Sequence, residues 1–246
     1  MAMKPFLILQ LRPETDASDD EFAAFLAKGG LSVDRVHRIR LDQENLPSDL
    51  RLEDYAGVIV GGGPGCVSDT ADKKHPVEAR IEAQILSLMP AITARDHPFM
   101  GCCYGIGILA HHLGATVSKD RYGEPVGPTD CVLTEDGAED PLLQDLAREF
   151  VALVGHKEAV QDLPQGCVHL VASDPCPFQM IRHGQNVYAT QFHPEADGDG
   201  FATRIRIYKD HGYFPPEDAQ RLTDLCHSAP VTVPPRMLRR FVERYG

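Results

Sequence analysis

A chain of 246 residues, 43% hydrophobic and 24% charged, has the composition of an ordinary globular protein and can bury a core without disulfides or metals. Its formal net charge of −12 repels polyanions, and no basic patch with interleaved aromatic residues stands out, so nucleic acid is not an expected partner. No stretch approaches the roughly 20 apolar residues of a membrane span, and the apolar run near the start is too short for a signal peptide, so no membrane is expected either.

The first half of the chain alternates short apolar runs with helical patterns. Four runs bounded by turn residues predict buried strands: Phe6–Leu11, Val33–Ile39, Ala56–Val60 and Pro98–Gly101. Three helices are predicted beside them: Asp20–Lys28, His75–Met89 and Gly105–Leu113. The first of these helices should begin at Asp19 or Asp20 and end at the glycine pair that follows it. Such alternation of strands and helices indicates right-handed βαβ units and a parallel sheet.

The second half of the chain has a different pattern. Short β-like segments separated by turn residues predict an antiparallel or mixed extension of the sheet, and they lie at Val117, Val132, Phe150–Val154, Val168–Ala172, Gln179–Arg182 and Val187–Phe192. Three helices should close the chain, at Gly200–His211, Pro216–His227 and Pro235–Tyr245. We therefore predict one α/β domain over residues 1–246, with a flavodoxin-like three-layer sandwich, a mostly parallel central sheet, helices on both faces and a helical extension from about residue 200.

The strongest chemical signal is a cysteine between two glycines, at the junction of a predicted strand and a predicted helix. Gly101 and Gly105 stand two residues either side of Cys103, which allows the sharp turn of a nucleophile elbow. The turn lifts the thiol clear of the sheet and places it at a helix N-terminus, where the helix dipole favours thiolate. The backbone N–H of Tyr104 is then available to an oxyanion.

Two further motifs supply the partners that a thiol nucleophile needs. His193 and Glu195 leave a predicted strand two residues apart, so the carboxylate can orient the imidazole while the other ring nitrogen faces Cys103. The glycine loop Gly61–Gly65 follows the strand Ala56–Val60 and should lie at the same sheet edge as the elbow. An amide of Gly62 or Gly63 can therefore provide the second oxyanion donor.

These three motifs, in this order, resemble the class I glutamine amidotransferase family. The resemblance implies a Cys103–His193–Glu195 triad that hydrolyses a glutamine or γ-glutamyl amide through a glutamyl thioester, with Tyr104 and Gly62 or Gly63 forming the oxyanion hole. The segment Gly155-His156-Lys157-Glu158 looks like the family segment that lines the substrate pocket. Members commonly carry Gln at the position of Gly107 and Asn at that of Gly155, so the substrate could be a γ-glutamyl compound rather than free glutamine.

Three hypotheses for the function stay open at this point: a glutamine-hydrolysing amidotransferase, a γ-glutamyl peptidase with the same triad, and a non-enzymatic redox or regulatory relative. Under the first hypothesis we expect a separate ammonia-accepting synthetase subunit. No cofactor or metal is predicted, because the adjacent His111 and His112 point about 100° apart on a helix and cannot share an ion. The seven cysteines show no framework spacing, which favours free thiols and a cytoplasmic protein.

Overall fold

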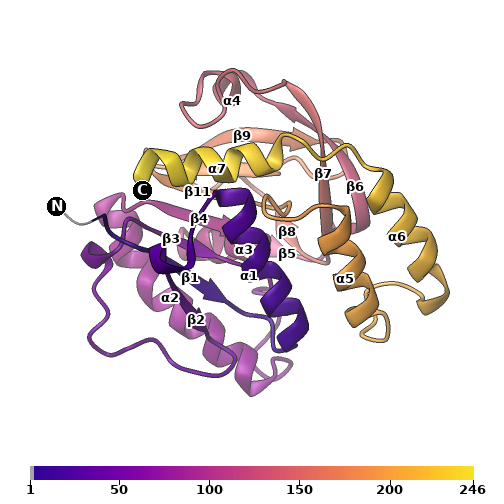
Figure 1. Cartoon of the computed structure of the whole chain (residues 1–246), viewed down its shortest axis with the longest axis horizontal. Helices are drawn as coiled ribbons and strands as arrows, with labels where there is room; N and C mark the ends of the chain where they lie inside the picture. Colours follow the sequence, from indigo (N-terminus) through magenta and orange to yellow (C-terminus); the bar gives the residue numbers. More distant parts are fainter. Residues whose placement is uncertain (1–2) are drawn as a thin grey trace.

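The computed structural model describes residues 3–246, and its centre is a nine-stranded sheet (Figure 1). The strands follow the order β2-β1-β3-β4-β11-β10-β9-β6-β7, and the pairs from β2 to β11 are parallel while those from β11 to β7 are antiparallel. The bounds are β1 Phe6–Gln10, β2 Val36–Arg40, β3 Gly57–Val60, β4 Phe99–Cys102, β6 Glu124–Leu133, β7 Glu149–His156, β9 Cys167–Ser173, β10 Met180–His183 and β11 Val187–Thr190. A separate antiparallel pair joins β5 (Val117–Ser118) to β8 (Ala159–Val160).

Helices cover both faces of this sheet. They are α1 Thr15–Gly29, α2 Pro76–Arg95, α3 Tyr104–His112, α4 Glu135–Glu139, α5 Gly198–Tyr208, α6 Ala219–Ser228 and α7 Pro234–Tyr245, with 3-10 turns at Val33–Arg35, Leu52–Asp54 and Pro216–Asp218. Strand β1 shows why both faces are apolar: Phe6 and Ile8 pack with α1 and α7, while Leu7 and Leu9 pack with α2 and α3. The predicted three-layer α/β fold is confirmed.

The helices α5 and α6 form a smaller third core at the side of the molecule (Figure 1). Phe201 and Ile205 of α5 pack with Leu222 and Cys226 of α6, and with Leu153 of β7. This packing fixes α5 next to the antiparallel part of the sheet. The α5 side chains that face inward are therefore held against the strands that carry the site described below.

Several predicted boundaries were wrong, and tertiary packing explains them. Helix α1 begins at Thr15, so Asp19 and Asp20 lie inside it and do not cap it, because Ala17 is buried in the core and extends the packed face. Helix α2 continues past Pro90, since Ile92 extends the stripe of buried residues on its inner face. The predicted stop of α1 is confirmed: Gly30 caps the helix in the left-handed region, at φ 69°.

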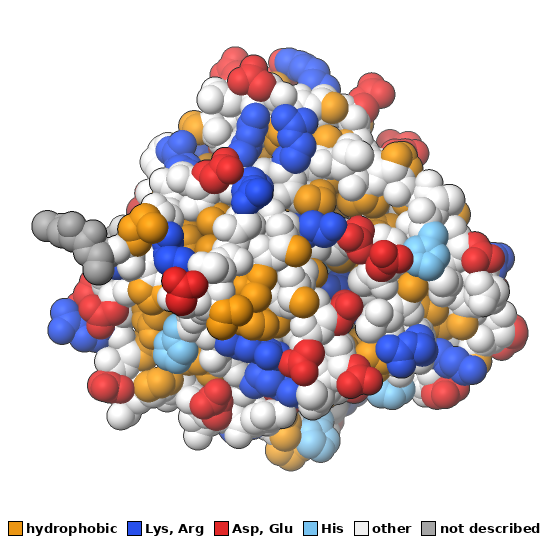
Figure 2. Space-filling view, in the orientation of Figure 1, with side chains coloured by type: hydrophobic (Ala, Val, Ile, Leu, Met, Phe, Trp, Pro, Cys, Tyr) orange, Lys and Arg blue, Asp and Glu red, His pale blue; other side chains and the backbone are white. Residues whose placement is uncertain are grey.

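The surface carries charges of both signs. Figure 2 shows Lys and Arg side chains mixed with Asp and Glu over the face that bears α1, α5 and α7. Within residues 3–246, no helix combines the length and the apolar character that crossing a bilayer requires. The expectation that the protein does not bind nucleic acid stays a prediction.

The parallel strands β1, β3, β4 and β11 bring the predicted site residues to one edge of the sheet. Their carboxyl ends meet at this edge, as in other open α/β sheets. Residues 61–65 follow β3, Cys103 follows β4, and His193 follows β11. Arg12 also lies at this edge, two residues beyond β1.

Candidate active site

Cys103 occupies the sharp turn between β4 and α3. Its backbone has φ 55° and ψ −88°, a positive φ that an L-residue adopts only when the surrounding structure holds it there. The Cys103 N–H donates to the carbonyl of Thr190 at 2.8 Å, which ties the turn to the end of β11. A side chain at Gly101 would lie 2.9 Å from the backbone of Gly105, so the strand and helix can approach this closely only with glycine there. The predicted sharp turn between strand and helix is confirmed, and the role of Cys103 as a nucleophile stays a prediction.

His193 and Glu195 form a buried hydrogen-bonded pair, as predicted. The Nδ1 of His193 donates to the Oε1 of Glu195 at 2.8 Å, so the neutral imidazole keeps Nε2 free to accept a proton. The same oxygen accepts from Nη2 of Arg204 at 2.8 Å. Glu195 is fully buried, which alone would raise its pKa, but its interactions with His193 and Arg204 lower that pKa strongly. The carboxylate therefore stays ionised and can orient the imidazole.

The surroundings of Cys103 and His193 shift the pKa values of both side chains. Burial raises the pKa of Cys103 to about 12, although Arg12 and Arg204 oppose this shift. Burial also lowers the pKa of His193 below its usual value of 6.5, in spite of the nearby Glu195. Burial of the sulfur thus acts against the helix dipole and the two arginines, which favour the thiolate.

The glycine loop lies beside the imidazole, and its two candidate amides differ. The N–H of Gly62 donates to the carboxylate of Glu21 at 3.2 Å, so this amide is already engaged. A side chain at Gly62 would lie 2.6 Å from Cε1 of His193 and 2.8 Å from Nη2 of Arg12. Gly63 contributes to the walls of both cavities that adjoin Cys103. Of the two predicted donors, Gly63 is the one that remains available.

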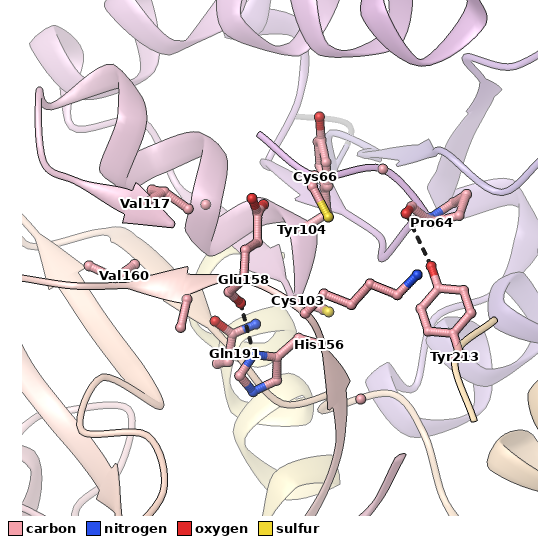
Figure 3. Close-up of a pocket in the computed structure, with 16 residues that line it drawn as sticks. Pro64, Cys66, Cys103, Tyr104, Val117, His156, Glu158, Val160, Gln191 and Tyr213 are labelled. Atoms are coloured by element: carbon pink, nitrogen blue, oxygen red, sulfur yellow. Dashed lines mark hydrogen bonds between the residues drawn. The ribbon is translucent and has the colours of Figure 1, made fainter. Parts of the chain in front are cut away.

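The first cavity, of about 430 Å³, extends from Cys103 towards α3 and the turn after β7. All five residues predicted to bind substrate contribute to its wall: Gly107, Gly155, His156, Lys157 and Glu158. In Figure 3, Cys103 lies between Glu158, His156 and Gln191 on one side and Pro64 and Tyr213 on the other. The structure thus brings the nucleophile and the predicted pocket segment together.

The family model described as Glutamine amidotransferase class-I matches residues 19–206, which is most of the chain. The chain belongs to this family. The matched range includes the glycine loop, the elbow, the pocket segment and the His193–Glu195 pair. The resemblance that the three motifs predicted is therefore confirmed.

Relatives of this chain include glutamine-hydrolysing GMP synthases. The chain is 29% identical over 184 residues to GMP synthase from Thermosipho melanesiensis, a match that covers 71% of this chain and 32% of that protein. It is 28% identical over 191 residues to one subunit of the glutamine-hydrolysing GMP synthase from Methanocaldococcus jannaschii, covering 73% of this chain and 91% of that one. The chain thus spans about a third of the length of the first relative.

The fold also matches solved structures over nearly its whole length. A glutamine amidotransferase from Thermotoga maritima superposes with a TM-score of 0.76 at 22% identity, over 98% of this chain and 97% of that one. A glutamine amidotransferase from Methylobacillus flagellatus gives a TM-score of 0.70 at 20% identity, over 99% and 94% of the two chains. At these identities the likeness establishes the shared fold.

Two residues of the predicted pocket segment make hydrogen bonds that hold neighbouring parts of the chain in place. The carboxylate of Glu158 accepts from the N–H of Val67 at 2.7 Å and of Ser68 at 2.8 Å, and so fixes the chain just after the glycine loop. His156 bonds through Nδ1 to the carbonyl of Glu158 and through Nε2 to Glu124, both at 2.9 Å. These contacts make the wall of the first cavity rigid.

One group of buried side chains has potential metal-ligand atoms close to one another. Ligand atoms of Glu124, His156 and Cys176 lie within 4.8 Å of one another, and all three residues are buried. Glu124 also accepts a hydrogen bond from Gln179. Because Glu124 and His156 already bond to each other, this cluster has an internal hydrogen-bond network that accounts for its proximity. The prediction of no metal stays a prediction.

A second cavity, of about 480 Å³, opens on the other side of Cys103. Its wall includes His193 and several residues that the motifs did not indicate, among them Arg12, Arg204, Tyr208, Tyr213 and Phe214. Glu21, which bonds to Arg12 at 2.9 Å, was also missed. The position of Arg12 just after a predicted strand was the one sequence signal for this group. Arg204 lies on a helix that the sequence predicted without indicating its inner face.

Proposed function

We propose that this amidotransferase hydrolyses a γ-glutamyl amide, either glutamine or a larger γ-glutamyl compound, through a thioester on Cys103. His193 takes the thiol proton as the sulfur attacks the amide carbon, and then gives it to the departing amine. Water, activated by the same imidazole, hydrolyses the thioester and restores the thiol. Glu195 keeps the imidazole in the orientation that both transfers need.

The proposed oxyanion hole consists of the N–H groups of Tyr104 and Gly63. The Tyr104 amide lies in the first turn of α3, where backbone N–H groups have no acceptor within the helix. We choose the Gly63 amide as the second donor because the N–H of the neighbouring Gly62 already donates to Glu21. Donors that are fixed before the reaction begins stabilise a tetrahedral oxyanion without any cost of reorganisation.

The observation that carries the proposal is the meeting of a partly exposed elbow cysteine and a buried, oriented histidine at one cavity. Cys103 is partly exposed, whereas His193 and Glu195 are almost fully buried. A purely structural cysteine would need neither the positive φ nor a hydrogen-bonded histidine–carboxylate pair beside it. This arrangement favours an enzyme over the redox or regulatory alternative.

We further propose that the first cavity holds the glutamyl group, with Gly107, Gly155, His156, Lys157 and Glu158 in its wall. A side chain at Gly107 would lie 3.3 Å from both Glu158 and Val67, so glycine keeps this part of the cavity open. The relative from Methanocaldococcus jannaschii is named as one subunit of its GMP synthase. If free glutamine is the substrate, a separate synthetase subunit that accepts ammonia belongs to the proposal.

The test is a panel of glutamine and γ-glutamyl amides, with ammonia or amine release as one readout and a glutamyl adduct on Cys103, detected by mass spectrometry, as the other. Cys103→Ala should abolish both readouts while the protein remains folded. Cys102→Ser is the matched control, because it replaces the neighbouring thiol by a side chain of similar size, and the folded variant should keep much of the activity. Turnover by Cys103→Ala, or no adduct with any substrate, would reject the proposal.

A further inference from the structure

The second cavity has the lining of a binding site for more than ammonia. It encloses about 480 Å³, part of it open to solvent. Its wall is largely apolar or aromatic, and it is formed by Val126, Phe201, Ile205, Tyr208, Tyr213 and Phe214. A site for a small, strongly hydrated amine does not need such a wall.

Two buried arginines in this cavity have donors without acceptors. Arg12 donates through Nε to Glu21 and through Nη1 to Tyr208, while its Nη2 makes no hydrogen bond within residues 3–246. Arg204 donates through Nη2 to Glu195, and its Nε and Nη1 are buried without a partner among the same residues. Charged donors without an acceptor at the wall of a cavity favour an anionic group there, because that group can accept their hydrogen bonds.

The position of His193 identifies which half of the substrate enters this cavity. His193 contributes to the wall of the second cavity and not to that of the first, and the general acid must reach the nitrogen of the departing amine. The sulfur is common to both cavities, so the acyl group can lie on one side of it and the amine on the other. The second cavity is therefore the leaving-group side of the site.

We propose that the leaving group is the amino group of an amino acid or short peptide with an apolar or aromatic side chain, whose carboxylate is bound by Arg12 and Arg204. This inference rests on the proposed γ-glutamyl hydrolysis and specifies its substrate class. Attack by the sulfur breaks the amide C–N bond, and the proton taken from the thiol leaves with the amine. Water then converts the thioester to glutamate, so that one amide and one water give one acid and one amine.

The comparison that tests this inference uses two substrates that differ only in the charge of the leaving group. They are γ-glutamylphenylalanine and its C-terminal carboxamide, and their kcat/KM values are measured on the same enzyme. A charge-assisted hydrogen bond in a buried site supports a preference for the carboxylate of about tenfold or more. Equal values in the wild-type enzyme, with glutamine hydrolysed normally, would overturn the inference and leave the proposed function standing.

Variants assign the preference to its residues. Arg204→Gln keeps one donor for Glu195 but removes the positive charge, so the ratio of the two kcat/KM values should fall towards one, whatever happens to the common rate. Phe214→Ala should reduce the preference for γ-glutamylphenylalanine over γ-glutamylglycine. If the carboxylate preference is unchanged in Arg204→Gln and the phenylalanine preference is unchanged in Phe214→Ala, these residues do not form the proposed leaving-group site. Absence of any adduct on Cys103, from glutamine or from either compound, would instead refute the proposed function itself.

Discussion

Replacing Gly62 by alanine should impair catalysis by displacing His193. The added methyl would lie 2.6 Å from Cε1 of the imidazole, about 1 Å inside ordinary carbon–carbon contact. It would also lie 2.8 Å from Nη2 of Arg12, whose other two nitrogens are held by Glu21 and Tyr208. Both neighbours are buried, so the ring has to move, and its 2.8 Å bond to Glu195 lengthens.

The size of the effect follows from that displacement. A misplacement of about 1 Å in a catalytic group can cost about 100-fold in rate, or about 2.7 kcal/mol of transition-state stabilisation. Overpacking should destabilise the fold by about 1–3 kcal/mol, which a thermal unfolding curve measures separately. The assay is γ-glutamyl amide hydrolysis by the folded variant under saturating and limiting substrate.

A matched control separates the effect of the site from that of an added methyl group. Gly200→Ala in α5 would place the methyl 3.6 Å from its nearest neighbour, Asp20, which is ordinary contact, and it should retain the wild-type rate. A Gly62→Ala enzyme that is folded and as fast as the wild type would refute the placement of His193 against the glycine loop. It would also remove the steric reason for glycine at position 62.

Three further predictions concern charge and protonation. Burial lowers the pKa of His193, and only the neutral ring can act as base, so the acid limb of the kcat/KM profile should have its midpoint below pH 6.5. The midpoint should be lower still in Glu195→Gln, because that variant lacks the carboxylate charge that raises the pKa of His193. A midpoint above pH 6.5 would contradict this prediction. Burial raises the pKa of Cys103 to about 12, so its alkylation by iodoacetamide, followed by peptide mass spectrometry, should keep rising with pH from 6 to 9, whereas a plateau near neutrality would indicate a resting thiolate. Glu158→Gln can accept only one of the two N–H bonds from Val67 and Ser68, so KM should rise about tenfold with a smaller change in kcat, while the exposed Glu149→Gln should match the wild type in both.

The sequence predicted the nucleophile and its partners because each lies in a short local pattern. Cys103 is marked by glycines two residues away, and His193 and Glu195 are two residues apart after an apolar strand. The rule that parallel strands end at one edge then brings these patterns together without any coordinates. The oxyanion donor could not be decided in the same way. The choice between Gly62 and Gly63 depends on Glu21, which is 41 residues from Gly62 and carries no motif.

The charged groups behind the triad were missed for a related reason. Arg204 lies nine residues after Glu195, and the sequence alone does not say whether an arginine in an amphipathic helix faces solvent or the interior. Here Phe201 and Ile205 pack in the third core, and Arg204 lies on the same inward face of α5. The start of α1 shows the same limit, since aspartates that commonly cap helices lie inside one whose boundary is decided by packing.

The walls of the two cavities are held by different parts of the chain. This difference concerns how recognition of the acyl group and of the amine would be divided under the proposed function. On the acyl side, Glu158 fixes the residues after the glycine loop through two backbone N–H groups. On the amine side, Tyr208, Tyr213 and Phe214 follow the range matched by the family model. The proposed amine side therefore takes several of its aromatic side chains from the segment that follows the matched range. Tyr213 connects the two, because its hydroxyl donates to the carbonyl of Pro64 at 3.1 Å, next to the proposed oxyanion donor (Figure 3). Under the proposed function, a leaving group that shifts this tyrosine would therefore act on the loop that carries the proposed oxyanion donor.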